Sequence, residues 1–134
     1  MKRIGIILTI LLCVGIIIVQ FVHSKNEVKQ EQVDKQFSYV LSQLADEVKS
    51  GSNIDILDRI VKLNTLKNYT TFKNEGTLTD YPAVLLTEQR NALKFNKTIN
   101  NKDQITETIK ILASDPQNKE AGEQLIFEFR QNMQ

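Results

Sequence analysis

The side chains that could carry out chemistry are few in this chain of 134 residues, and they are scattered along it. The only histidine, His23, directly follows a long apolar stretch, and the only cysteine, Cys13, lies inside that stretch. Catalysis needs a nucleophile, a base or a metal set within reach of one another. A single imidazole beside an apolar stretch is typical of a polar residue at an interface. We therefore predict no catalytic, cofactor-binding or metal-binding residue, and no cofactor.

Carboxylates do occur at helical spacing. Asp46 and Glu47 form one pair, and Asp55 and Asp58 form another. Lys or Arg residues flank each pair, which is typical of a solvated helix face. The sequence has no HExxH zinc motif, no glycine-rich phosphate loop, no GxSxG and no pair of cysteines. These observations favour a protein that is not an enzyme.

The charges are balanced, with 17 basic against 16 acidic residues and a net charge of +1. No strong field would attract the chain to a polyanion, so we predict no nucleic-acid partner. The part that follows the apolar stretch has no cysteine, so it must fold without a disulfide. The high content of Ile, Lys and Asn is typical of an AT-rich genome, and we expect a bacterial cell envelope as the setting.

The apolar stretch covers residues 4–22 and contains no charged residue. Nineteen residues in a helix extend about 28 Å, close to the thickness of the hydrocarbon core of a bilayer. Most of these residues are Ile, Leu, Val or Phe. We therefore predict a transmembrane helix over 4–22 that acts as a signal-anchor. Representative membrane-anchor positions along it are Ile4, Leu8, Leu12, Ile16, Val19 and Val22.

The flanking charges predict the orientation of this helix. Lys2 and Arg3 precede it as a basic cluster, whereas the basic residues that follow it alternate with acidic ones. Basic flanks stay in the cytoplasm. We expect residues 1–3 to be a cytoplasmic tip and the C-terminal domain to be extracytoplasmic in a single-pass protein of the cell membrane.

A cleaved signal peptide is the alternative. Its apolar core is usually 7 to 15 residues long, which is shorter than the stretch seen here. The tripeptide Val22-His23-Ser24 could nevertheless serve as a cleavage site. Cleavage would release a small secreted or periplasmic helical binding domain, of an inhibitor or immunity type.

Residues 23–32 are almost entirely polar and predict a stalk, followed by a soluble helical domain over 33–134. At the start of that domain, apolar residues recur at helical spacing and form a candidate contact stripe. The stripe comprises Val33, Phe37, Val40, Leu41 and Leu44. The spacing is that of a coiled-coil seam, but it lasts barely two heptads. The stripe could pack within its own domain, or it could contact a second copy or another protein.

Further signals divide the rest of the domain into short helices. Gly51 ends the first helix, and a second is expected from Ser52 or Asn53 to about Lys67. Residues 69–81 could form a short β-hairpin or an ordered loop. Pro82 indicates the start of the next helix.

Two more helices complete the expected fold. Asn101 and Gln104 resemble a capping box at the start of one of them, and Asp115-Pro116 separates it from the last. The fold class is therefore mainly α: an N-terminal transmembrane helix followed by a small bundle of four to five short helices.

The function that this organisation predicts is that of a protein-interaction or assembly subunit of an envelope complex. The expected partners are the lipid bilayer and either another envelope protein or a second copy of the chain. We infer no small-molecule substrate.

Overall fold

The structure is a computed structural model that describes residues 2–72 and 81–133. In its first helix, the described side chains are those of Ile16, Val19, Gln20 and residue 24 onward. Within these residues the chain is mainly helical and contains no strand, only one isolated antiparallel bridge between Ile99 and Met133. Its helices are α1 (Lys2–Ser50), α2 (Asn53–Leu66), the short 3-10 helix η1 (Lys67–Tyr69), α3 (Tyr81–Lys94), α4 (Lys102–Ser114) and α5 (Lys119–Asn132).

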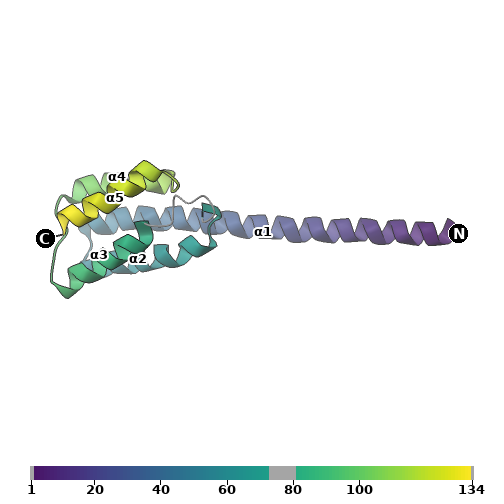
Figure 1. The fold of residues 1–134 in the computed structure, drawn as a ribbon, viewed down its shortest axis with the longest axis horizontal. Helices are drawn as coiled ribbons and strands as arrows, with labels where there is room; N and C mark the ends of the chain where they lie inside the picture. The colour runs from purple at the N-terminus through teal and green to yellow at the C-terminus, as the bar shows by residue number, and fades with distance from the viewer. Residues whose placement is uncertain (1, 73–80, 134) are drawn as a thin grey trace.

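The longest element is α1, a single helix of 49 residues. At 1.5 Å per residue it is about 73 Å long, so it extends well beyond the bundle (Figure 1). The expected stalk is part of this helix, and residues 24–29 are all exposed. The helix continues because residues 16–50 contain neither glycine nor proline, and it ends one residue before Gly51.

The five α-helices form a closed ring of contacts. The helix α1 packs on α2 and α4, α3 packs on α2, α5 packs on α4, and α3 packs on α5 to close the ring. The pairs α2–α3 and α4–α5 therefore lie on opposite sides of α1, with their axes roughly along it (Figure 1). This arrangement confirms the prediction of a helical bundle, in which four of the α-helices are short and the fifth is the end of α1.

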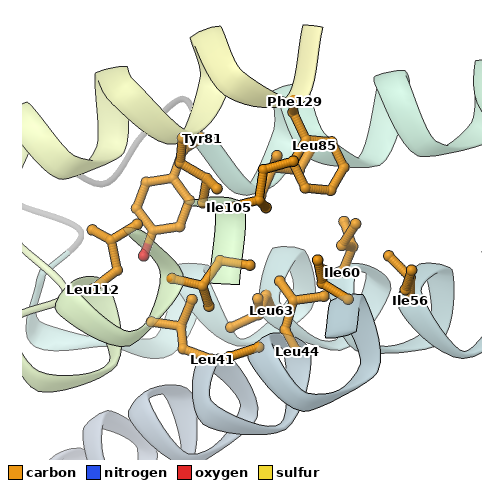
Figure 2. Packing of buried hydrophobic residues seen from close by; sticks show 14 of the residues in the cluster. Leu41, Leu44, Ile56, Ile60, Leu63, Tyr81, Leu85, Ile105, Leu112 and Phe129 are labelled. Atoms are coloured by element: carbon orange, nitrogen blue, oxygen red, sulfur yellow. The ribbon is translucent and has the colours of Figure 1, made fainter. Parts of the chain in front are cut away.

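The core is built from apolar side chains that all five helices contribute (Figure 2). Phe37 and Leu44 of α1 and Phe129 of α5 are fully buried. Burying a large apolar side chain contributes roughly 1.5 to 3 kcal/mol. Gly122 favours the close approach of α5 to α3, because a Cβ there would lie 3.2 Å from the ring of Tyr81, a tighter contact than usual. The phenol of Tyr81 is buried as well, and burial raises its pKa well above the ordinary value.

The start of α2 is fixed by a reciprocal cap. Ser52 Oγ accepts from the backbone N–H of Asp55 at 3.3 Å, and the Asp55 carboxylate accepts from Ser52 N at 3.1 Å. The carboxylate also accepts from Ser52 Oγ at 2.6 Å, and these hydrogen bonds lower the pKa of Asp55. The predicted start of this helix is confirmed, as is its end near Lys67.

The predicted capping box at α4 is wrong. Asn101 precedes α4 in the left-handed region, with φ of 51°, and its side chain caps no backbone N–H. Its amide instead donates to the side chain of Gln104. Asparagine tolerates this backbone region better than other non-glycine residues, so Asn101 is used here for the turn and not for the cap.

Two expectations extend beyond the described residues. Residues 73–80, most of the candidate hairpin, lie outside them, and the described start of that segment is the end of η1. The side chains of Ile4, Leu8, Leu12 and Val22 also lie outside them, whereas Ile16 and Val19 are exposed. Among the residues that the structure describes, no helix has a stretch that is long and apolar enough to cross a bilayer.

Candidate functional site

The candidate contact stripe lies inside the bundle. Phe37, Val40, Leu41 and Leu44 have no exposed surface, and only Val33 is half-buried. They face α2 and α4, with which α1 packs. The structure therefore supports the interpretation in which the stripe packs within its own domain. A surface for a partner has to be sought on the outside of the bundle.

At the base of the bundle, the stalk is tied to the segment that follows α2. Gln30 Nε2 donates to the carbonyl of Tyr69 at 3.0 Å. The carboxylate of Asp34 accepts from Thr71 N at 2.9 Å and from Thr71 Oγ1 at 2.6 Å. These bonds join residues more than thirty positions apart. They fix the direction in which α1 leaves the bundle.

One turn further along α1, an aromatic contact continues this junction. The rings of Phe37 and Phe72 meet edge to face, with their centroids 6.2 Å apart. Beside them lies an open groove of about 480 Å³ between α1 and the α4–α5 turn. It is lined by Asp34, Lys35, Ser38, Phe72 and residues 114–117. The groove offers the hydroxyl groups of two serines, the carboxylates of Asp34 and Asp115 and the ammonium of Lys35.

A second, smaller hollow of about 250 Å³ lies at the other end of the bundle, between α3 and α5. Arg130 Nε donates to Glu88 Oε1 at 2.9 Å across it. Phe95 borders the hollow and is 62% exposed. Glu88 offsets the charge of Arg130, whereas the ammonium of Lys97, which donates to the carbonyl of Met133 at 3.4 Å, gives the hollow one further positive charge.

A buried carboxylate lies between α4 and α5. Glu128 is only 2% exposed, and it accepts hydrogen bonds of 2.8 Å from Gln104, Thr108 and Gln124. A buried carboxylate needs such partners to offset its loss of hydration. All three donors are neutral side chains that hold it in place. Glu128 faces neither hollow, so we interpret it as a link between α4 and α5.

Two pairs of charged groups lie on the surface within one helix each, Lys35 with Glu31 and Lys110 with Glu107. Lys35 and Lys110 lower the pKa values of Glu31 and Glu107 through hydrogen bonds and charge attraction within one helical turn. Exposed pairs of this kind contribute little to stability. In the part of the chain that the structure describes, no three His, Cys, Asp or Glu side chains are close enough to hold a metal ion.

Sequence reasoning missed the Asp34–Thr71 tie and the Glu128 cluster. Each depends on partners that are far away along the chain, and neither leaves a local motif. The only signal for Glu128 was its position, three residues after the apolar Leu125 and just before Phe129 on the inner side of the last helix.

No protein family, curated protein or solved structure matches this chain. The fold and its surfaces define a small helical-bundle domain built on the end of one long N-terminal helix.

Proposed function

We propose that this chain is a single-pass membrane protein whose helical domain acts outside the cytoplasm as an interaction or assembly subunit of an envelope complex. The observation that carries the proposal is the continuity of α1. The same helix contains the apolar residues 4–22 and, further on, Phe37 and Leu44 in the centre of the bundle.

The apolar part of α1 has the composition of a membrane anchor. It contains fourteen Ile, Leu, Val or Phe residues, each worth roughly −0.3 to −0.6 kcal/mol on insertion. Their sum is about 4 to 8 kcal/mol, which exceeds the cost of the polar Gln20 near its end. Lys2 and Arg3 keep the preceding end in the cytoplasm, so the bundle lies on the outer side.

The stalk supports the role in interaction. Residues 23–32 extend about 15 Å as a helix, and the hydrogen bonds of Gln30 and Asp34 fix them to the bundle. A bundle held off the membrane surface in a fixed direction can present one chosen face to a neighbour.

Release by a signal peptidase is the second candidate. It is favoured by the core, whose first member among the described side chains is Phe37. A chain cut after residue 24 would retain the whole bundle as a secreted or periplasmic binding domain.

Fractionation of cells that express the full chain separates the two proposals. We expect the full-length chain, identified by its mass, to remain in the membrane fraction after carbonate extraction. We also expect added protease to digest the bundle in intact spheroplasts. Recovery of a carbonate-soluble chain that begins near Lys25 would establish the secreted form. Protection of the bundle until lysis would reverse the proposed orientation.

A further inference from the structure

The outer side of α2 carries exposed apolar residues. Ile54 is 70% exposed and Val61 is 39% exposed, with the exposed Asp58 between them. These three positions are four and three residues apart, so they lie along one line on the helix. Arg59 is directed toward Glu47 of α1 and Asn53 toward α3. The line therefore faces away from the bundle.

A second line on α3 continues this surface. Leu86, Arg90 and Leu93 have the same spacing, with Arg90 exposed and the two leucines half-buried. Gln89 donates to Asn53 of α2 at 2.9 Å, whereas Glu88 pairs with Arg130 of α5. A rotation of 100° per residue then places Arg90 on the outer side of α3 that adjoins α2. We call these six residues the α2–α3 face.

The charges on the face are separated by helix. Asp58 lies 3.9 Å from the guanidinium of Arg59, but Arg59 also pairs with Glu47 at 3.5 Å, so the α2 line keeps a net negative charge. Arg90 gives the α3 line a positive charge. The helices are antiparallel, and Asn53 bonds to both Gln89 and the carbonyl of Lys97. Five residues further along α2, Asp58 therefore lies within about one helical turn of the height of Arg90.

Two anchored copies in one membrane must point in the same direction. A two-fold axis that relates them therefore runs along the membrane normal, which is the direction of α1 in the proposed topology. All helices of the bundle lie roughly along α1 (Figure 1). Such an axis brings α2 of one copy against α3 of the other at the same height.

We propose that the α2–α3 face is a homodimer surface and that its occupant is a second copy of this chain. Asp58 of each copy pairs with the partner's Arg90, which gives two equivalent ion pairs. Ile54 and Val61 contact the partner's leucines. The direction of the axis rests on the proposed membrane anchor. Confinement to a membrane raises the effective concentration of the partner, so a surface of six residues is sufficient for association.

The test uses charge reversal in the full chain, reconstituted in phosphatidylcholine vesicles and labelled with donor or acceptor fluorophores. Asp58→Arg or Arg90→Asp alone puts like charges at both pairs, and we expect energy transfer to show association at least about ten-fold weaker. A mixture of the two single variants restores both pairs, so we expect full transfer between them. The control Glu120→Arg makes the same change of charge as Asp58→Arg, but at an exposed position on α5, and should leave association unchanged.

The outcomes separate this surface from the anchor. A chain that stays in the vesicles but shows no transfer at any lipid ratio overturns the dimer and leaves the anchor intact. Dimers that do not respond to either reversal, or single variants that fail to associate with each other, also overturn the proposed face. A chain that does not enter the vesicles overturns the anchor and, with it, the axis on which the face depends. Circular dichroism of each variant verifies that the bundle is folded.

Discussion

The two parts of α1 form one helix but are stabilised by different surroundings. Residues 33–50 are held by the bundle, with Phe37 and Leu44 fully buried against other helices. Residues 24–29 are all exposed, and the uncharged stretch 4–22 before them has mostly apolar side chains. Helical structure alone therefore says nothing about what stabilises a segment. Residues 33–50 are therefore stabilised by their own domain. The apolar stretch 4–22 needs a different environment, which we propose to be the bilayer.

The largest expected effect comes from charges placed in the proposed membrane-spanning part of α1. Leu8→Arg with Leu12→Arg places two guanidinium groups in the proposed span, at roughly 3 kcal/mol each in addition to the lost leucine contribution. We expect the double variant to leave the carbonate-resistant membrane fraction. Val28→Arg, on the exposed stalk, is the matched control and should stay in the membrane. Retention of both variants would contradict the anchor.

A core substitution tests the other part of the helix. Leu44→Ala leaves a cavity in the bundle and should lower the free energy of unfolding by 2 to 5 kcal/mol. Denaturant unfolding followed by circular dichroism measures this change. Val28→Ala, on the same helix but outside the bundle, should change it by less than about 0.5 kcal/mol. Equal effects at the two positions would show that the stalk is packed too.

The junction between the two parts is tested at Asp34. Asp34→Ala removes both hydrogen bonds from Thr71 and should cost about 1 kcal/mol, with faster hydrogen exchange confined to residues near the base of the bundle. Asp34→Asn retains an acceptor and should recover part of the protection. Unchanged exchange at Thr71 in the alanine variant would mean that the tie does not fix the stalk.

The smallest expected effect concerns pH at the start of α2. Ser52 lowers the pKa of the Asp55 carboxyl in the folded state, so the charged form contributes stability above the ordinary value of 3.8. That contribution is lost as the pH falls through the lower folded value. We expect Asp55→Ala to be less stable than the parent at pH 7 and the difference to disappear in strong acid. A difference that is constant with pH would exclude the ionised cap.

The sequence predicted the helices of the bundle better than the way in which they pack on one another. Gly51, Ser52 and Asp115-Pro116 act locally, and the predicted helix limits at these residues agree with the structure. The apolar spacing of Phe37 and Leu44 identified an inner face, but the same spacing also fits a coiled-coil seam, so it could not decide what the face contacts.

The candidate surfaces were less accessible to sequence reasoning. The α2–α3 face combines residues from two helices, and only their antiparallel packing brings Asp58 near the height of Arg90. Similarly, Asn101 has the residue type of a helix cap, and only its backbone conformation shows that it serves a turn. Properties that depend on packing between helices leave no period or motif in a single sequence.

An unbroken helix also transmits rotation. Each residue in α1 turns the chain by 100°, so one residue inserted near Val28 would turn the whole bundle by that angle relative to residues 4–22 and raise it by only 1.5 Å. Two inserted residues would present nearly the opposite side of the bundle to a neighbour. Seven would raise it by about 10 Å and almost restore its original direction. The length of the stalk thus determines the azimuth of the bundle as well as its height.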